Sequence, residues 1–358
     1  MLECRPYLSN DQSLWDGFCD TSGDAWFWQT TAFLHYQTAY APAYKTVPKH
    51  LLFFQDGKLV ALCPLAVEQS PTSPHKTFSL GGDPLPVPVL STTLSESERE
   101  SIRRHILEYL DTLAVQEGVA KISFRQSILA PHLLYATYPL VNDWVSNNFL
   151  DISMQTRLID LRVEERTLWS QVRKSYHSLI NKTAKHFNFR FLDQHSITPA
   201  YFGAYRDLHQ KAAGRVTRPA DTFEAMHEWI RKGFAFLVLA EHENVISACA
   251  LLIHYKNQVF YASACNDPDL ENEWSLGHFL QWNVIQTLKT RGIEHYDLAS
   301  WPMTPQWSFV PTPEEKHISF FKSGFGGRPA PLFRSEKFYS SEVFEKEYTA
   351  RMKRLLQV

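Results

Sequence analysis

One order of predicted elements occurs twice in this chain, which favours a duplicated domain. In the first copy, the apolar runs 51–54 and 59–63 flank a turn at Asp56-Gly57, a pattern typical of a β-hairpin. A helix with one apolar face follows over about 100–116. Gly118 stops this helix, and an apolar strand spans 120–124.

The second copy keeps the same order. The runs 236–239 and 245–249 flank a polar turn, a helix spans about 276–291 up to Gly292, and a strand follows at 294–298. Helical sequence precedes both hairpins, at about 11–40 and 199–231. We interpret the two copies as versions of one α/β unit. The alternative is two unrelated α/β domains that share these common elements.

The length of 358 residues suits two domains of roughly 150 residues each. A predicted strand at 157–161 and a predicted helix at about 164–186 lie between the two copies. We therefore expect an N-terminal domain over 1–162, a C-terminal domain over 163–330 and a tail over 331–358 that packs back on the N-terminal domain. Each domain is predicted to be α/β (α+β), with a mixed sheet flanked by helices.

The composition excludes several classes of protein. A net charge of −2 and a hydrophobic fraction of 44% rule out intrinsic disorder. The five cysteines are odd in number and form no CxxC pair, which argues against a disulfide framework and a zinc knuckle. The first residues lack an apolar leader, and the longest nearly apolar stretch, 245–253, is far shorter than the roughly 20 residues of a membrane span. We expect a cytoplasmic protein without an integral membrane segment.

A positively charged segment lies at 167–192. It contains Arg173, Lys174 and three further Lys or Arg residues but no Asp or Glu. Cations without acidic neighbours repel one another unless an anion lies against them. The segment therefore indicates binding of phosphate or carboxylate; a solvated helix face is the alternative.

A second basic group follows a predicted helix that ends at Gly214. Arg215 and Arg218 lie in the loop after it, and their planar guanidinium groups could hold a phosphate or carboxylate with two hydrogen bonds. Pairing with Glu224 or Glu228 is the alternative. His209, just before the loop, is either a general base or a structural histidine.

A third group surrounds Lys322 near the C-terminus. The three glycines Gly324, Gly326 and Gly327 follow it closely and permit close backbone approach to a ligand, or form a simple turn. The segment matches neither a Walker loop nor a dinucleotide-binding GxGxxG motif. The histidines form no HxH or HExxH pair, so we expect no catalytic metal.

Several short segments lie in an order that is found in a known family. These are Trp15, FWQTTAFLHY at 27–36, the hairpin that ends at 61–65, the basic run from Arg173, the strand at 259–264, Leu280-Gln281-Trp282, Tyr296-Asp297-Leu298, and Phe321-Lys322 followed by Phe325-Gly326-Gly327. The order resembles the Fem family of cell-wall aminoacyl ligases and its wider group of acetyltransferase-like proteins. The resemblance covers nearly the whole chain.

This resemblance implies two tandem GNAT-like domains, with the active site in the C-terminal one. It also implies an amide-forming acyltransferase that moves an aminoacyl group from aminoacyl-tRNA, or an acyl group from acyl-CoA, to an amine. The donor would be a co-substrate, with no tightly bound cofactor. The partners would be a small-molecule or cell-wall-precursor acceptor and, for one donor, tRNA. The chain lacks the coiled-coil insertion of some Fem enzymes, and its Arg215–Arg218 loop matches no Fem motif, which suggests a different acceptor.

The site residues are predicted as follows. Asp297 would accept or orient the amine proton, with capping of the following turn as its structural alternative, and Lys322 would neutralise phosphate or the developing oxyanion. His209 is the third catalytic candidate. The substrate-binding candidates are Arg173, Lys174, Tyr176, Arg215, Arg218, Tyr261, Ser263 and Gln281. No activated Ser or Cys is evident, because Cys249 and Cys265 lie in strand-like sequence, so we expect direct transfer without a covalent intermediate.

Backbone amides where the helix begins near Gly277 could also hold a phosphate, although Glu271 and Glu273 beside them would repel it. Two other functions remain open. One is an acetyl-CoA-dependent N-acetyltransferase of an amino sugar in surface-polysaccharide synthesis. The other is a catalytically silent module that binds a nucleotide-sugar or RNA.

Overall fold

The computed structural model describes residues 2–270 and 272–357. The chain divides into two compact units, each described here by itself. The first unit comprises residues 1–155, 304–310 and 331–358, and the second comprises 156–303 and 311–330. The division thus falls at residue 155, a few residues before the expected boundary at 162. No helix built from the described residues combines the length and apolarity that crossing a bilayer needs.

The first unit contains two sheets. One has the strand order β1-β3-β4-β8, and the other runs β10-β17-β9-β6-β5-β2 with β7 also beside β9. The strands are β1 (Leu2–Pro6), β2 (Lys45–Pro48), β3 (Leu51–Gln55), β4 (Lys58–Cys63), β5 (Ala66–Gln69), β6 (Lys76–Phe78), β7 (Leu85–Pro86), β8 (Val89–Leu90), β9 (Val119–Gln126), β10 (Leu150–Asp151) and β17 (Arg328–Phe338), the last of which begins in the second unit. The helices are α1 (Gln12–Thr21), α2 (Thr31–Tyr40), α3 (Glu96–Glu117), α4 (Pro131–Leu134) and α11 (Ser341–Leu356).

The first predicted hairpin is confirmed as β3 and β4, which pair in antiparallel register. Asp56 and Gly57 connect them with φ of 50° and 76°, as a two-residue turn of this kind requires. Helix α3 ends where expected, since Gly118 adopts a left-handed φ of 66° and its N–H caps the last turn. The following strand, β9, pairs in parallel with β6.

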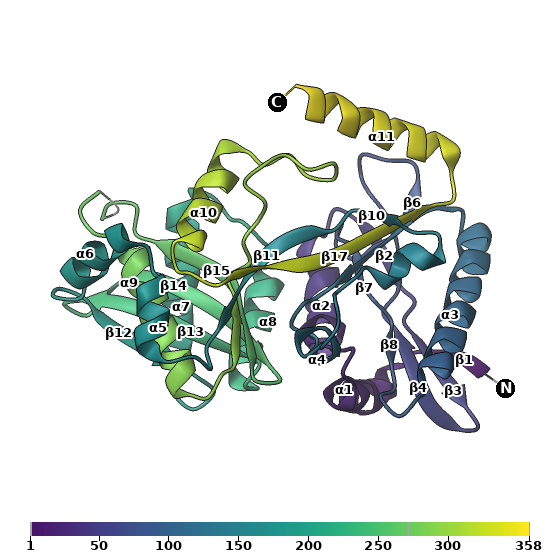
Figure 1. Cartoon of the computed structure of the whole chain (residues 1–358), viewed down its shortest axis with the longest axis horizontal. Coiled ribbons are helices and arrows are strands. Elements are labelled where there is room, and N and C mark those ends of the chain that lie inside the picture. Colours follow the sequence, from purple (N-terminus) through teal and green to yellow (C-terminus); the bar gives the residue numbers. More distant parts are fainter. Residues whose placement is uncertain (1, 271, 358) are drawn as a thin grey trace. The chain divides into compact units, whose positions relative to one another are not determined.

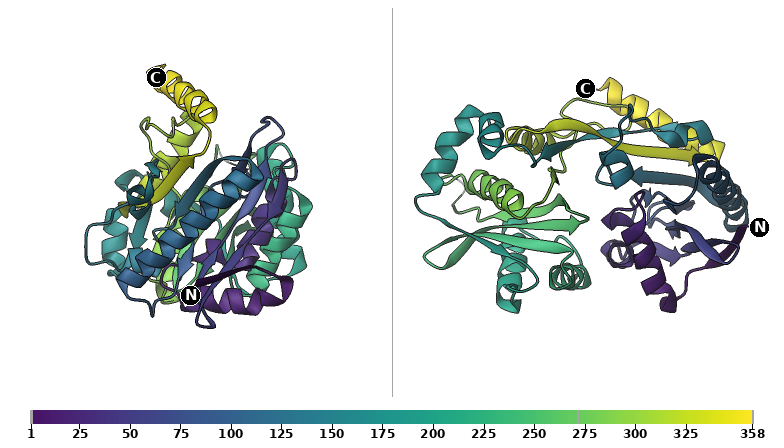
Figure 2. Two further views of the ribbon diagram at one scale, coloured as in Figure 1. Left: turned by 90° about the vertical axis from the view of Figure 1, so that its right-hand side faces the viewer. Right: turned by 60° about the horizontal axis from the view of Figure 1, so that its bottom comes forward.

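The second unit is built on the sheet β12-β13-β14-β15-β16-β11. Its strands are β11 (Met154–Asp160), which starts in the first unit, β12 (Asn188–Leu192), β13 (Ala235–His242), β14 (Val245–Tyr255), β15 (Gln258–Asn266) and β16 (His295–Asp297). Its helices are α5 (Glu165–Gln171), α6 (Lys174–Thr183), α7 (Pro199–Ala213), α8 (Ala220–Arg231), α9 (Leu276–Thr290) and α10 (Pro313–Ser323). Figures 1 and 2 show α9 over one face of this sheet and α7 with α8 over the other.

Strand side chains alternate between these two faces. Val238, Ala250 and Leu252 belong to the buried cluster that includes residues of α6 and α9, whereas their neighbours along the strands point to the α7 and α8 face. The second predicted hairpin is confirmed as β13 and β14. Strand β16 pairs in parallel with β15, so α9 crosses between parallel strands as α3 does between β6 and β9. In both units, therefore, the helix of the repeated order lies in the connection between two parallel strands.

Two predicted helices are each divided in the structure. The expected helix over 164–186 is α5 and α6, separated at Val172 and Arg173, because both residues adopt extended ψ angles and the Arg173 N–H donates to the Gly324 carbonyl at 2.7 Å. The helical sequence over 11–40 is α1 and α2 with an irregular connection between them. The connection between α1 and α2 contains Ser22, Gly23 and Asp24, which are residues typical of a turn, so the prediction of one helical stretch overlooked a local signal there.

Candidate functional site

The candidate site lies where two parallel strands separate. Strands β15 and β16 pair only from Gln258 to Phe260. Beyond Asp297 the chain continues its pairing with β11 alone, since the Leu298 N–H donates to the Arg157 carbonyl at 2.9 Å. The β14–β15 register also shifts in this region, so that Ala262 is an extra residue, a β-bulge that redirects neighbouring side chains. The C-terminal half of β15 is thus free of its parallel neighbour.

A cavity of about 550 Å³ borders this half of β15. It is lined by Ala212 at the end of α7, by Tyr261, Ala264, Cys265 and Asn266 of β15, by Trp274, Ser275, Leu276, Gly277, His278 and Leu280 at the start of α9, and by Glu314, Ile318 and Phe321 of α10. Its wall combines apolar surface with a few polar groups, which is typical of small-molecule sites.

The first turn of α9 contributes backbone donors to this wall. Ser275 precedes the helix without a side-chain cap, and the first amides of a helix have no partner within it. Leu276 and Gly277, which carry these amides, line the cavity. The helix start could therefore hold a phosphate group. Glu273 is exposed beside it, and Glu271 lies outside the described residues.

Asp297 and Lys322 meet at the turn that follows β16. The Asp297 Oδ1 accepts hydrogen bonds from the Thr156 hydroxyl and from the Ala299 N–H, the latter at 2.8 Å. The Lys322 Nζ donates to the Ala299 carbonyl at 2.8 Å and lies 5.1 Å from the centre of the Tyr261 ring. Ala299 has a left-handed φ of 51°, which is strained for a residue other than glycine. Asp297 thus caps the turn, the structural alternative considered from the sequence, and lies close enough to Lys322 for their charges to interact.

Burial shifts the titration of both groups. Asp297 is 3% exposed, and burial raises the pKa of its carboxyl to about 6, opposed by its hydrogen bonds and by Lys322. Lys322 is 8% exposed, and burial lowers the pKa of its amine to about 8, opposed by Asp297. Burial also raises the pKa of the Tyr261 phenol, which stays protonated at neutral pH. The Tyr261 hydroxyl can therefore donate a hydrogen bond to a group in the cavity.

Arg173 does not face an open ligand site. Its guanidinium donates to the Tyr176 hydroxyl at 2.7 Å and to the Phe320 carbonyl and Ser323 hydroxyl of α10, and its Cζ lies 3.8 Å from the centre of the Phe320 ring. Tyr176 is buried against the same segment. Arg173 and Tyr176 thus hold the end of α10, the helix that carries Lys322, and are positioning residues in this arrangement. Lys174, next to them, is exposed.

Gly324 provides the space for the Tyr176 ring. A Cβ at this position would lie 2.1 Å from the Tyr176 Cε2 atom. We expect Gly324→Ala to lower the free energy of unfolding by about 2–3 kcal/mol, because the packed ring must move, as measured by urea denaturation. The matched control is Gly203→Ala in α7, where a Cβ meets no atom within 4 Å and should stabilise the helix slightly. Equal urea midpoints for Gly324→Ala and the wild type would show that the ring is not fixed.

The basic loop after α7 contains a partly buried arginine, Arg218, and an exposed one, Arg215. Arg218 packs with His209, its Nη2 lying 3.4 Å from the histidine Nε2, and its Cζ lies 5.5 Å from the centre of the Phe223 ring. Burial, followed by the charge of Arg218, lowers the pKa of His209, which keeps the imidazole neutral. Arg215 is exposed, and Glu228 pairs with Arg231 and Lys232 rather than with this loop.

Arg173, Arg215 and Lys322 were each predicted to contact an anion, but among the described residues they do not converge around one site. Arg173 binds the end of α10, Lys322 binds the turn after β16, and Arg215 lies on the loop that follows α7. Within the positive run 167–192, Arg190 pairs with the Glu241 carboxylate and Lys182 donates to the Glu273 backbone carbonyl. Polar groups that are distant in the sequence thus bind several of these cations in the fold.

Two other predicted residues lie next to the cavity rather than in its lining. Ser263 follows the bulge in β15. Gln281 is buried in α9, where its Oε1 accepts a hydrogen bond from the Tyr296 hydroxyl at 2.9 Å and its Nε2 has no partner among the described residues. Of the predicted substrate-binding residues, Tyr261 alone appears in the cavity lining.

Sequence reasoning missed most of the aromatic wall. Trp274, His278 and Phe321 line the cavity, and the His278 ring packs edge-on to Phe321 with centres 4.9 Å apart. Burial, followed by the charge of Arg173, lowers the pKa of His278 to about 4, so this ring is neutral. The sequence offered one signal for these residues. The helix was predicted to start near Gly277, and Trp274 and His278 lie beside that start.

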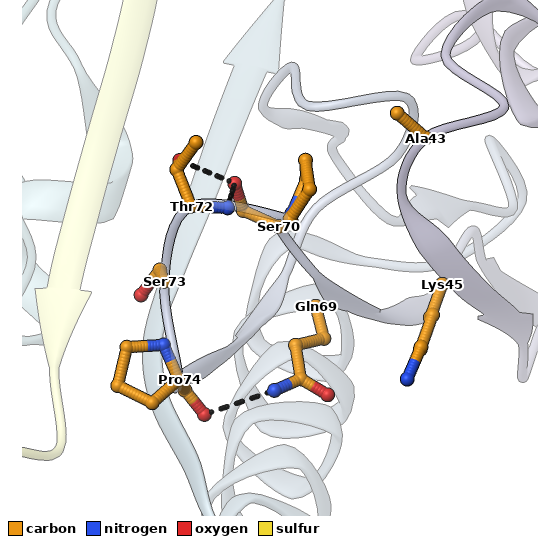
Figure 3. Close-up of a pocket in the computed structure, with 8 residues that line it drawn as sticks. Ala43, Lys45, Gln69, Ser70, Thr72, Ser73 and Pro74 are labelled. Atoms are coloured by element: carbon orange, nitrogen blue, oxygen red, sulfur yellow. Dashed lines mark hydrogen bonds between the residues drawn. The ribbon is translucent and has the colours of Figure 1, made fainter.

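A second hollow lies in the first unit (Figure 3). It is lined by Ala43 and Lys45 and by residues 69–74 of the loop after β5. Its polar groups are hydroxyls, one amide and one exposed amine, and the Ser70 and Thr72 hydroxyls bond to each other at 3.0 Å. No buried titratable group borders it, so it lacks the chemistry of the cavity beside β15.

The comparisons with known proteins concern the fold and one domain of the chain. Residues 170–301 match the model of the acetyltransferase (GNAT) domain family. FemX resembles the chain with a TM-score of 0.66 at 12% identity over 96% of this chain and 99% of that one. A tandem GNAT protein from the clavulanic acid biosynthesis pathway has a TM-score of 0.51 at 12% identity over 95% and 99%. A search of curated sequences finds no match.

A third structure is the C-terminal domain of a protein from Agrobacterium fabrum described as a lysylphosphatidylglycerol synthetase, with a TM-score of 0.57 at 12% identity over 96% of both chains. The expected fold class is therefore confirmed, and the domain match supports the expected enzyme class, an acyltransferase. Residues 170–301 thus match the acetyltransferase (GNAT) domain family, and the chain as a whole shares its fold with FemX and with the tandem GNAT protein.

Proposed function

We propose that this protein forms an amide bond by direct transfer of an acyl or aminoacyl group from an activated donor to an amine, with the reaction at the cavity between β15 and α9. The observation that carries the proposal is the cavity itself. It opens where β15 leaves β16, the first turn of α9 offers backbone amides to it, and the Tyr261 hydroxyl stays protonated in its wall. Lys322 lies behind Tyr261.

The reaction needs three elements of this site. The neutral amine of the acceptor attacks the donor carbonyl, a C–N bond forms, and the C–S bond of a thioester or the C–O bond of an ester breaks. The Lys322 ammonium uses one of its three protons on the Ala299 carbonyl, and its charge stabilises the developing oxyanion. The leaving sulfur or oxygen departs as an anion that accepts a hydrogen bond from the Tyr261 hydroxyl, and it takes up the proton that the ammonium formed on the acceptor releases through solvent.

The donor test compares the two classes. Acetyl-CoA or aminoacyl-tRNA, each labelled in its acyl part, is incubated with the protein and with an amino sugar or a lysine-containing peptide, and the amide product is followed by mass spectrometry. Consumption of either donor with amide formation supports the proposal. If neither is consumed while phosphate ligands still bind, the protein is a binding module. Acetyl-CoA is the second candidate in its own right, because the uncapped start of α9 suits its pyrophosphate.

Gly277 allows the donor site to be blocked selectively. A Cβ here would meet the Phe321 Cζ at 3.4 Å and the Asn266 Nδ2 at 3.5 Å, so Gly277→Ala fits at ordinary contact distance. Gly277→Leu would extend into the cavity and should raise the donor KM at least tenfold, because it competes for the same space. Donor KM is measured for both variants, with circular dichroism as a check on folding. A Leu variant with the wild-type donor KM would place the donor elsewhere.

The exposed Arg215 is proposed to contact an anionic group of the acceptor, because the end of α7 borders the cavity at Ala212. We expect Arg215→Ala to weaken acceptor binding by about 1.5 kcal/mol, the range of a hydrogen bond to a charged group, without loss of folding stability. Arg218→Ala is the comparison, since removal of its contacts with His209 and Phe223 should lower stability by about 1 kcal/mol. Acceptor KM and urea midpoints separate the two roles; an unchanged acceptor KM in Arg215→Ala would assign that residue to the surface.

A further inference from the structure

Two arginines lie opposite each other in the first unit. Strand β17 (Figure 1) pairs antiparallel with β9, and the register places Arg334 directly opposite Arg125. Residues directly opposite in an antiparallel pair point to the same face, and like charges in this position destabilise a sheet. The pair therefore needs negative charge from another part of the structure.

The protein supplies little of this charge. The Nε and Nη2 atoms of Arg125 are buried without a hydrogen-bond partner among the described residues. Its Nη1 lies 4.0 Å from the Asp83 Oδ2, an oxygen that already accepts a hydrogen bond from the Gln37 amide. In the part of the chain that the structure describes, the guanidinium of Arg334 donates no hydrogen bond.

The next carboxylate on this face is already occupied. Glu336, two residues after Arg334, is fully buried and binds Arg351 through two hydrogen bonds and Lys121 at 3.0 Å. Its charge is balanced by these two partners. Asp83 is thus the one carboxylate that remains for both Arg125 and Arg334 among the described residues that interact with them.

Burial makes this imbalance costly. It lowers the pKa of both guanidinium groups, and the charge of Arg334 lowers that of Arg125 further. Asp83 opposes the shift in both groups, and Glu336 opposes it in Arg334. An uncompensated buried cation costs several kcal/mol. In Arg190, by contrast, the Nε and Nη2 atoms both donate hydrogen bonds to the Glu241 carboxylate.

Aromatic rings decide which arginine can reach a ligand. The rings of Trp28 and Phe33 lie over the Arg125 guanidinium, with their centres 5.2 and 5.0 Å from its Cζ. They cover Arg125 and partly offset its burial by cation–π attraction. Arg334 is partly exposed, so its N–H groups remain available for direct contact.

We propose that Arg334 and Arg125 form a binding site for an oxyanion, either a carboxylate or a phosphate group, on this face of the first unit. Arg334 holds the oxyanion with its planar pair of N–H donors, and Arg125 supplies the second positive charge from beneath Trp28 and Phe33. The site is separate from the proposed transfer reaction and is tested without it.

The test uses the full chain and direct binding. Calorimetric titrations with inorganic phosphate and with acetate, at constant ionic strength set by sodium chloride, distinguish the two oxyanions. We expect at least one of them to bind the wild type, and Arg334→Met to weaken that binding at least tenfold. Arg190→Met is the matched control, because its guanidinium is already paired with Glu241, and it should bind the anion as the wild type does.

Stability supplies an independent outcome. In chloride buffer without the oxyanion, Arg125→Met and Arg334→Met should unfold at the same or a higher temperature than the wild type, because each removes an uncompensated charge. The oxyanion should raise the unfolding temperature of the wild type but not of Arg334→Met. The proposal is overturned if neither anion binds, if Arg334→Met retains wild-type affinity, or if both Met variants are less stable than the wild type in chloride.

Discussion

Replacement of Lys322 by methionine should lower kcat for acyl transfer about 100- to 1,000-fold, the usual effect of removing one group that stabilises an oxyanion. Methionine keeps most of the side-chain volume in a position that is 8% exposed, so packing against Tyr261 is preserved. The donor KM should change little, because the Lys322 charge stabilises the oxyanion that develops in the transition state more than the bound donor. A loss confined to kcat is the signature of an interaction made in the transition state.

The pH dependence of kcat/KM tests whether Lys322 acts in catalysis, because a purely structural lysine would not set the alkaline limb of the profile. Transfer needs the Lys322 ammonium, which is lost as pH rises through its pKa of about 8. It also needs the Asp297 carboxylate that holds the turn, which is lost as pH falls through its pKa of about 6. The kcat/KM of the wild type should therefore be highest between about pH 6 and 8. Lys322→Met should lose the alkaline limb, and its acidic limb should move upward, because Asp297 no longer has a cation beside it.

A structural explanation of the same loss is tested by Ala299→Gly. Lys322 and Asp297 both bind the Ala299 backbone, which has a φ of 51°, so Lys322→Met could act by releasing this turn. Glycine adopts the left-handed conformation without strain. If the double variant Lys322→Met/Ala299→Gly regained wild-type kcat, Lys322 would be a support for the turn and not a catalytic residue. We expect no such recovery.

The elements that the sequence predicted best are those with local causes. The turns at Asp56-Gly57 and Glu243-Asn244 and the helix stops at Gly118 and Gly292 all adopt positive φ, a preference that residue type alone reveals. The repeated order of hairpin, helix and strand followed from these local signals together with apolar periodicity. The fold class could therefore be predicted without knowledge of any long-range contact.

The site could be predicted only in part, because its charges are set by partners distant in the sequence. Arg173 was expected to bind a ligand, but it binds the Phe320 carbonyl, 147 positions along the chain. Asp297 and Lys322, both predicted as catalytic residues, lie at one turn, but the burial that shifts their pKa values is a property of the fold and has no local signal in the sequence. Arg125 was not among the predicted site residues, because its neighbours in the sequence do not show that Arg334 lies opposite it in the sheet.

The largest stability effect is expected at Glu68, a residue of β5 that has 0% exposure. Its carboxylate accepts four hydrogen bonds, from the Thr46 and Ser79 hydroxyls, both at 2.7 Å, and from the N–H groups of Gly81 and Gly82 at 2.6 and 2.9 Å. Gly81 and Gly82 have φ of 62° and 79°, so the carboxylate holds two left-handed residues in place. A glutamate at the end of a strand would ordinarily be expected to face solvent.

We expect Glu68→Leu to lower the free energy of unfolding by about 4 kcal/mol, because it leaves four donors without an acceptor in a buried site. Glu68→Gln should cost less, since one oxygen remains, but its amide would face donors rather than acceptors. Urea denaturation measures both, and Glu100→Leu on the exposed face of α3, with a side chain 66% exposed, should change stability by less than about 0.5 kcal/mol. If Glu68→Leu were as stable as Glu100→Leu, the four donors would have to find water or other partners, and the carboxylate would not be what fixes the Gly81-Gly82 turn.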